Sequence, residues 1–193
     1  IIPGSKSVRA DLEYLRSQGW EQDIQRHLRL GGKVMGICGG YQILGKLIDD
    51  PDGVEGTQGQ SQGLDLLNVN TVLTNEKTLT NSRGHLTLNN RTVPVSGYEI
   101  HVGKTNTTSS SPIQLDTNTA DGALSDCNQI FGTYLHGIFD SPQAFELICE
   151  WAGAERVAKI DHQQLKEDGI NRIADAIEEH LDLNLLWPEL SKQ

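Results

Sequence analysis

The sequence predicts an α/β fold with an open, mostly parallel sheet and flanking helices. A short apolar run at Lys33–Ile37 is typical of a buried strand, and the helix-like segment Gly39–Leu47 follows it at once. A second strand-like run, Gln129–Leu135, ends directly before a histidine. The 193 residues, of which 36% are hydrophobic and 22% charged, suffice for one domain with its own core. Strands that alternate with helices favour parallel pairing.

The chain before the first of these runs is predicted to hold a short buried strand, a loop and two helices. In order, these elements span Ile1–Pro3, Gly4–Ser7, Val8–Gln18 and Glu21–Leu30. Leu12 and Leu15 share one face of the first helix, and Ser7 stands at its N-cap position. Gly31 and Gly32 end the second helix.

The rest of the chain is predicted to pass through a loop and a strand-rich region before it returns to helices. Asp49–Gly63 is Gly-rich and acidic, which indicates a long loop or lid with solvated carboxylates. Leu64–Thr107 has the texture of strands, and a polar loop at Thr105–Ser111 follows. Further helices are predicted from Ser141-Pro142 to Trp151 and, with an amphipathic pattern, over His162–Leu186.

Charge, hydropathy and cysteine content limit the class of protein. The net charge of −10 argues against a nucleic-acid partner. No apolar run approaches the roughly 20 residues that cross a bilayer, and no signal peptide is visible. Three cysteines without a CxxC pair favour a reducing cytoplasm and disfavour a zinc site. Because Ile1 starts abruptly, we expect residues 1–193 to be one domain of a longer polypeptide, with one or more N-terminal strands missing.

Cys38 stands on the turn between the first strand run and the helix behind it. Glycines at positions 36, 39 and 40 let the backbone bend sharply and let a ligand approach closely. The positive end of the helix dipole and a nearby imidazole would lower the pKa of the thiol into the reactive range. A buried structural cysteine is the alternative, and the local pattern leaves both interpretations open.

His136 is the natural partner of Cys38 because it also follows a predicted strand. The C-terminal ends of parallel strands share one edge of an open sheet, where ligands bind. At that edge His136 would act as general base and general acid for the sulfur. The alternative is a histidine that merely hydrogen-bonds the backbone.

Two further segments carry candidate site residues. Gly4-Ser5-Lys6-Ser7 lacks the glycine spacing of a phosphate-binding loop, so a loop that donates backbone N–H groups to an oxyanion fits better. Glu99 and His101 are two residues apart, so a strand places them on one face. This pair leaves three interpretations open: it binds a metal, it orients His136, or it forms a solvated strand edge. The remaining histidines show no metal-ligand spacing.

Five motifs occur in the order found in the C-terminal glutamine amidotransferase domains of cobyric acid synthases, and the chain resembles that family over nearly its whole length. They are Pro3-Gly4-Ser5-Lys6, Gly36-Ile37-Cys38-Gly39-Gly40-Tyr41-Gln42, Asp52-Gly53-Val54-Glu55-Gly56, Gly97-Tyr98-Glu99-Ile100-His101 and Gly132-Thr133-Tyr134-Leu135-His136-Gly137. The resemblance implies a class I glutamine amidotransferase-like fold, which is similar to that of flavodoxin.

The resemblance also implies a reaction. Cys38 would attack the side-chain amide of glutamine, and His136 would protonate the departing ammonia. Water would then hydrolyse the γ-glutamyl thioester on Cys38. Further residues implied to hold the oxyanion or the substrate are Gly4, Ser5, Gly39 and Gln42.

Beyond this chain, the resemblance implies an N-terminal synthetase domain that receives the ammonia. That domain would use ATP and Mg²⁺ to amidate the corrinoid adenosylcobyrinic acid a,c-diamide in the cytoplasm, while residues 1–193 would need no cofactor and no metal. Neighbouring alternatives are the glutaminase domain of a cobyrinic acid a,c-diamide synthase, a peptidoglycan-type Cys-His amidotransferase and a non-catalytic domain of this fold.

One position departs from the commoner pattern of class I glutaminases, which places a glutamate two residues after the catalytic histidine. Here that position is Ile138. The chain resembles cobyric acid synthases in lacking the glutamate. An apolar side chain cannot orient an imidazole, so Glu99 becomes the candidate for orienting His136. Tyr41 likewise replaces the histidine of the commoner Gly-His-Gln pattern.

Overall fold

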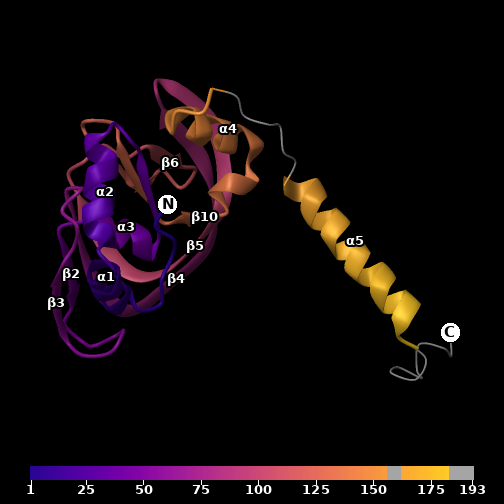
Figure 1. Cartoon of the computed structure of the whole chain (residues 1–193), viewed down its shortest axis with the longest axis horizontal. Coiled ribbons are helices and arrows are strands. Elements are labelled where there is room, and N and C mark those ends of the chain that lie inside the picture. The colour runs from indigo at the N-terminus through magenta and orange to yellow at the C-terminus, as the bar shows by residue number, and fades with distance from the viewer. Residues whose placement is uncertain (156–161, 183–193) are drawn as a thin grey trace. The chain divides into compact units, whose positions relative to one another are not determined.

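Two β-sheets with helices packed on them make up residues 1–155 of the computed structural model, which also describes residues 162–182 (Figure 1). Helix α5 (His162–His180) belongs to a separate unit and is described by itself. The α/β class with flanking helices that the sequence predicts is confirmed.

The smaller sheet contains the strand that leads to the cysteine turn. β1 (Val34–Ile37) pairs in parallel with β9 (Ile130–Thr133), and β8 (Ala123–Leu124) pairs with β9 in the antiparallel direction. The two strand runs recognised in the sequence are therefore parallel neighbours. Their register sets the last residue of β1 opposite the last residue of β9, so both strands end at one edge.

The start of the chain lies along the other side of β1. Ile2 forms a parallel bridge with Gly36, its N–H donates to Met35 O (2.8 Å), and its carbonyl accepts from Ile37 N–H (3.0 Å). The predicted first strand is thus present as a single bridge. These bonds fix the following loop beside the end of β1.

Two helices precede β1, with bounds close to the prediction. They are α1 (Val8–Ser17) and α2 (Trp20–Arg29). Val8, Leu12 and Leu15 of α1 recur at spacings of four and three residues and are all buried. This spacing places their side chains on one stripe that packs into the core.

The N-terminus of α1 is stabilised by a distant residue. Ser7 precedes the helix, but its side chain makes no capping hydrogen bond. Instead, Glu55 Oε2 accepts the N–H of Val8 at 2.7 Å. A full carboxylate charge complements the positive end of the helix dipole better than a neutral hydroxyl does. Ser7 thus occupies the predicted N-cap position, but its side chain does not supply the capping hydrogen bond.

The larger sheet is built around a long antiparallel hairpin, which Figure 1 shows as a curved ribbon. The hairpin turns at Asn89 (φ 49°) and Asn90 (φ 59°), and two consecutive positive φ angles suit a tight hairpin turn. The strands of the larger sheet run in the order β10-β5-β4-β2-β3. Outside this order, β6 pairs with β4 and with β7. Their bounds are β2 (Leu47–Asp50), β3 (Gly59–Gln62), β4 (Val69–Leu88), β5 (Arg91–Thr107), β6 (Ile113–Leu115), β7 (Ala120–Asp121) and β10 (Leu135–His136).

Strand direction is mixed, which corrects the expectation of a mostly parallel sheet. Parallel pairing is found between β1 and β9, at the Ile2 bridge and between β2 and β4, whereas the other strand pairs are antiparallel. A two-residue turn can return the chain only as an antiparallel neighbour, because a parallel crossover needs a dozen or more residues. β5 also continues through Thr107, since Thr105 pairs with Thr71, so the predicted polar loop begins later.

The helix behind the cysteine, α3 (Gly39–Leu44), is shorter than predicted. Gly45 is extended (φ −73°, ψ −174°), and Lys46 N–H donates to Val69 O at 2.7 Å. Of the residues that the sequence assigned to the end of this helix, Leu47 instead begins β2, where it pairs with β4.

The predicted loop at Asp49–Gly63 is more ordered than expected. Its two ends belong to β2 and β3, which pair with each other. Between them, the fully buried carboxylate of Asp50 accepts the N–H groups of Val54 (2.7 Å) and Glu55 (3.1 Å). The prediction of solvated carboxylates is wrong for Asp50, since these bonds replace water and fix the position of Glu55.

The C-terminal part of the first unit contains helix α4 (Pro142–Trp151), which begins at the predicted proline and follows the short helix η1 (Ile138–Asp140). Two apolar clusters fill the unit. One joins α1, α3 and the sheets around β1, and the other joins α4 to the hairpin. The second cluster buries Ala144, Leu147, Ile148 and Trp151 of α4 together with Ile138.

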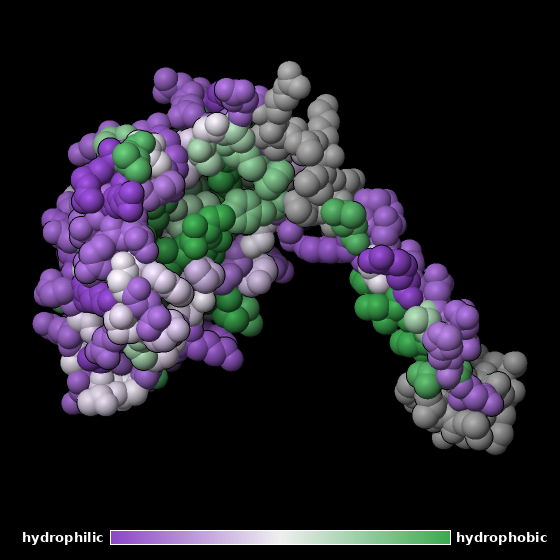
Figure 2. Space-filling model, viewed as in Figure 1, coloured by the Kyte–Doolittle hydropathy of each residue, from purple (hydrophilic) through white to green (hydrophobic). Residues whose placement is uncertain are grey.

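The predicted tail helix is confirmed for α5, and the predicted residues 183–186 lie outside the described part. Apolar side chains line one side of α5 and are exposed within its own unit (Figure 2): Leu165, Ile170, Ile173, Ile177 and Leu181. Among the described residues, no helix is long and apolar enough to cross a membrane.

The close contact between the chain start and α3 yields a stability prediction. A Cβ on Gly40 would lie 2.9 Å from Pro3 O and closer still to Ile2 O. We expect Gly40→Ala to lower the free energy of unfolding by about 2 kcal/mol, because backbone must move. Urea denaturation followed by tryptophan fluorescence measures this change.

The matched control is Gly169→Ala on α5, where a Cβ meets nothing within 4 Å. It should leave the urea midpoint of the first unit unchanged. Equal midpoints for Gly40→Ala and the unmodified protein would contradict the prediction.

Candidate active site

Cys38 occupies a strained turn between β1 and α3. Its backbone angles are φ 54° and ψ −112°, a region that non-glycine residues rarely adopt. Its N–H donates to Thr133 O (2.8 Å), and its Sγ donates to Ile100 O (3.4 Å). Strain of this kind persists where the surrounding structure enforces it, and it is common at active sites. The turn thus presents the sulfur at the edge where β1 and β9 end.

The glycines around Cys38 are required by close backbone approach. A Cβ on Gly39 would lie 2.8 Å from Ser5 N and 3.0 Å from Val8 Cγ2. The backbone N–H of Gly39 also acts to lower the pKa of the Cys38 thiol. The loop at Ser5 and the start of α3 therefore bring backbone N–H groups together beside the thiol.

His136 lies across Gly4 from the cysteine. A Cβ on Gly4 would be 3.3 Å from His136 Cε1 and 3.6 Å from Cys38 Cβ. His136 pairs with Tyr98 across β10 and β5, and the two rings stack at 5.1 Å with an interplanar angle of 9°. Its Nε2 is buried and has no hydrogen-bond partner among the described residues. The structure thus brings the two predicted catalytic residues together.

Burial sets the protonation of both groups. It raises the pKa of the Cys38 thiol, and the charge of Glu55 adds to this, although the Gly39 N–H opposes it. Burial also lowers the pKa of His136, and the neighbouring His101 contributes in the same direction. The expectation that the helix N-terminus lowers the thiol pKa is therefore wrong, because α3 is one short helix and desolvation outweighs it. At neutral pH the pair rests as thiol and imidazole.

A cavity of about 640 Å³ opens beside these residues. Gln42 contributes to its wall and is 2% exposed, with its Nε2 donating to Tyr134 Oη at 3.0 Å. Gln42 Oε1 is buried and has no partner among the described residues. A buried acceptor without a donor is costly unless a bound molecule supplies one. The cavity is lined by Gly4, Ser5, Lys6, Val8, Cys38, Gln42, Val54, Glu55, Lys77, Ile100, His101, Val102 and His136.

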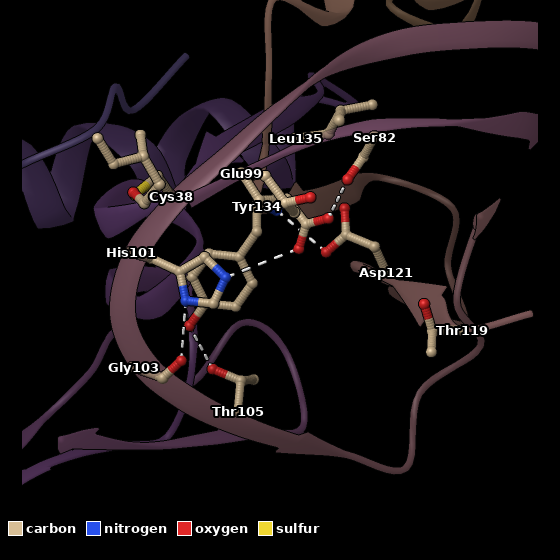
Figure 3. Close-up of polar contacts among 12 residues, drawn as sticks. Cys38, Ser82, Glu99, His101, Gly103, Thr105, Thr119, Asp121, Tyr134 and Leu135 are labelled. Carbon is tan, nitrogen blue, oxygen red and sulfur yellow. Dashed lines mark hydrogen bonds and ion pairs between the residues drawn. The ribbon is translucent and has the colours of Figure 1, made fainter. Parts of the chain in front are cut away.

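A partly buried polar network includes His101, which lines the cavity, together with Glu99 and Ser82 (Figure 3). His101 Nδ1 contacts Gly103 O (2.9 Å), and its Nε2 lies 3.7 Å from Glu99 Oε2. The ring of His101 stacks on Tyr134 at 3.8 Å, and Ser82 Oγ donates to Glu99 Oε1 at 2.6 Å. His101 lowers the pKa of Glu99 through this contact. The network fixes one wall of the cavity.

Glu99 faces His101 and Ser82 in this network. Among the described residues it makes no hydrogen bond or ion pair with His136, and the support that His136 receives comes from Tyr98. Ile138, at the position where other class I glutaminases have glutamate, is fully buried in the apolar cluster with α4.

Asp121 supports the segment between β9 and β10. Its carboxylate accepts from Thr133 Oγ1 (2.5 Å) and from Tyr134 N–H (3.1 Å), and burial raises its pKa. Thr133 O in turn holds the N–H of Cys38. Sequence patterns gave no sign of Asp121, because its partners follow 12 and 13 residues later in the chain.

Two residues that line the cavity were not predicted as site residues from the sequence. Glu55 and Lys77 lie on its wall, although the acidic loop was expected to be a solvated turn. Glu55 had one signal, its place in the Asp-Gly-Val-Glu-Gly motif. Among the described residues, no group of three or more His, Cys, Asp or Glu side chains could hold a metal ion.

A strained cysteine on a strand–helix turn, with an imidazole across one glycine, is an arrangement compatible with a cysteine nucleophile and an acyl intermediate. Over residues 1–144 the chain matches the CobB/CobQ-like glutamine amidotransferase domain, and it belongs to that family. The family expected from the five motifs is thereby confirmed.

Cobyric acid synthases from three species are similar to this chain over nearly all of its length. The Vibrio parahaemolyticus protein is 60% identical over 187 residues, which cover 97% of this chain and 39% of that protein. The Photobacterium profundum protein is 54% identical over 191 residues, 98% of this chain and 39% of that protein. The Aliivibrio fischeri protein is 52% identical over 196 residues, 98% of this chain and 40% of that protein. The chain thus spans about two fifths of the length of these curated relatives.

The pKa directions predict how the cysteines react with iodoacetamide, which modifies thiolates. Cys127 is exposed, and its pKa is lowered, chiefly by the hydrogen bond with Ser125. At pH 7 we expect Cys127 to be alkylated about 10-fold faster than Cys38, whose rate should keep rising above pH 9. Mass spectrometry of the two peptides over a pH series measures both rates.

Cys149, whose pKa burial raises, serves as the internal control and should follow the slower course. Faster alkylation of Cys38 than of Cys127 at pH 7 in the ligand-free protein would show that the thiol is already ionised.

Proposed function

We propose that this chain hydrolyses L-glutamine to glutamate and ammonia through a γ-glutamyl thioester on Cys38. The observation that carries the proposal is the placement of Cys38 and His136 on either side of Gly4 at one wall of the cavity. Family membership supports the same reaction class.

The protons and bonds of this reaction balance through His136. The imidazole takes the thiol proton as the sulfur attacks the amide carbon, and it returns that proton to the nitrogen as the C–N bond breaks. Ammonia leaves and the thioester remains. Water then attacks with His136 as base, and the proton returns to the sulfur as glutamate leaves. A neutral imidazole at rest, which the lowered pKa of His136 provides, suits the first step.

The negative charge of the tetrahedral intermediate needs donors that are in place beforehand. Gly39 N–H favours the ionised form of the sulfur, and the Ser5 backbone N lies beside Gly39. Two such N–H groups at fixed positions form an oxyanion hole, in which a single donor is worth roughly 3 kcal/mol. Gly4 leaves room for the substrate, and Gln42 Oε1 would accept an N–H of the bound glutamine.

We further propose that the ammonia serves an N-terminal synthetase part of a longer protein. That part would use ATP and Mg²⁺ to amidate adenosylcobyrinic acid a,c-diamide to cobyric acid, whereas this chain would need no cofactor. The names of the similar proteins, and the two fifths of their length that the chain spans, support this assignment. The three free cysteines suit the reducing cytoplasm as its place of action.

Covalent labelling with a glutamine-mimicking diazo ketone tests the glutaminase proposal. We expect a mass shift on the peptide that contains Cys38 and protection of that peptide by excess glutamine. Cys38→Ser and His136→Ala should each lower glutamate release by the full-length protein at least roughly 1000-fold.

Two results bear on the mechanism separately. Both variants should still perform the ATP-dependent amidation when ammonium chloride replaces glutamine, which controls for folding. Absence of labelling on the Cys38 peptide of the full-length protein would contradict the proposal.

Stacking on Tyr98 replaces a carboxylate as the support of the His136 ring. We therefore expect Tyr98→Leu to lower kcat about 10-fold with little change in KM, because the imidazole loses its fixed orientation. Steady-state glutaminase kinetics measure this split. Tyr98→Phe keeps the ring and is the matched control.

If Tyr98→Leu and Tyr98→Phe show the same kcat as the unmodified protein, ring stacking does not position His136.

Glu99 enters the proposed site as an auxiliary residue that acts through His101, because its carboxylate faces that ring.

A further inference from the structure

The cavity beside Cys38 carries charged groups that cleavage of an amide bond does not require. One acidic residue, Glu55, and two basic residues, Lys6 and Lys77, line the same cavity as Cys38. Hydrolysis needs the nucleophile, the imidazole and the oxyanion donors, all of which are already assigned to other residues. The additional charges therefore point to recognition of the substrate.

Glu55 is held firmly in place by backbone groups. Its own N–H donates to the buried carboxylate of Asp50, and its Oε2 accepts from Val8 N–H at 2.7 Å. The side chain is half-buried, and burial together with the charges of Asp50 and Asp11 raises its pKa. In the described residues, no lysine, arginine or histidine forms an ion pair with it. A half-buried carboxylate without a cationic partner is suited to bind a cationic group of a ligand.

The position of Glu55 relative to the sulfur suits a small amino-acid substrate. Val8 connects Glu55 with the cysteine turn. Its N–H donates to Glu55, and its Cγ2 packs against Gly39, next to Cys38. The charge of Glu55 also reaches the sulfur, where it disfavours the thiolate. A glutamine whose amide carbon lies at Cys38 carries its α-ammonium group only a few bonds away.

Lys77 reaches the cavity by a local irregularity in β4. The register passes from Leu73 opposite Gly103 to Thr78 opposite His101, so residues 74–77 bulge out opposite Val102 alone. Both Lys77 and Val102 line the cavity. A bulge that turns a side chain toward a site is a recurrent feature of sheets. The cavity therefore presents positive charge as well as negative charge, as a zwitterionic substrate requires.

A buried acceptor gives an independent sign that a ligand belongs here. Gln42 is 2% exposed, lines the cavity, and leaves its Oε1 without a donor among the described residues. Glu55 accepts from Val8 N–H but has no cationic partner among the described residues, so the cavity offers an incoming ligand one unsatisfied acceptor and one uncompensated carboxylate. A ligand with N–H groups at separate positions, such as an amino-acid amide, matches that need.

We propose that Glu55 binds the α-ammonium group of the substrate glutamine and so selects the free amino acid over amides that lack this group. The inference rests on the proposed glutaminase function and assigns a specificity-determining residue to it. Binding would also neutralise the carboxylate that opposes ionisation of Cys38. Occupancy of the cavity thus favours the nucleophile.

The competing explanation is that Glu55 only stabilises the N-terminus of α1 through Val8. Glu55→Gln separates the two roles, because the amide oxygen can still accept from Val8 N–H while the negative charge is lost. A purely structural role affects every amide substrate alike, whereas recognition of the ammonium group affects only substrates that carry it.

The test compares L-glutamine with glutaramate, the monoamide of glutaric acid, which lacks the α-amino group. We expect the full-length protein to prefer glutamine, and Glu55→Gln to lower kcat/KM for glutamine about 10- to 100-fold, mainly through KM. The value for glutaramate should change less than about twofold. Glu13→Gln, an exposed carboxylate on α1, is the matched control and should change neither value.

Each outcome decides between the explanations. Equal losses for both substrates, or no loss for either, would overturn the assignment of Glu55 while turnover of glutamine by the unmodified protein still supports the proposed function. Absence of glutamine turnover by that protein would refute the proposed function itself and the inference with it.

A second measurement needs no variant. In the unmodified protein, glutamine should protect Cys38 from the diazo ketone at about 10-fold lower concentration than glutaramate does. Equal protection by the two compounds would also overturn the proposal.

Discussion

Close contact between backbone segments at the cysteine turn is the constraint on which the rest of the site depends. Ile2 bridges β1, and the residues that follow it pass so near Gly39 and Gly40 that no side chain fits there. Such an approach is possible only without Cβ atoms. It sets the Ser5 N–H beside the thiol and puts Gly4 between Cys38 and His136. The proposed nucleophile, its proposed base and the proposed oxyanion donors thus owe their proximity to one packing arrangement.

Burial is the second property that this arrangement imposes. Desolvation disfavours the charged forms of both reactive groups, so the thiol and the imidazole remain neutral at rest. A neutral pair holds no ion pair that an incoming substrate would have to break. Behind it, Asp121 fixes the junction of β9 and β10, and Tyr134 joins Gln42 to the hairpin. This network fixes the wall of the cavity, and in the proposed function the substrate supplies the missing hydrogen-bond donor of Gln42.

Elements with strong local signals could be predicted from the sequence with close bounds. α1, α2 and α4 carry regular apolar spacing or a proline at the first position, and β1 and β9 are short apolar runs. The length of α3 and the direction of most strands could not be predicted, because competing backbone partners decide them. Lys46 leaves the helix since Val69 O accepts its N–H, and Val69 is remote in the sequence.

The sequence by itself determined the α/β class, the family and the two residues that we propose carry the chemistry, because glycine turns and motif order are local properties of the chain. Tertiary structure decided what surrounds them. It placed Glu55 at the cavity, stacked Tyr98 on His136 and turned Glu99 toward His101. It also reversed the expected shift of the Cys38 pKa. The physical reason is that desolvation and charge depend on distances in space, and Glu55 and Ile100, which are 17 and 62 positions from Cys38 in the sequence, both act on this thiol.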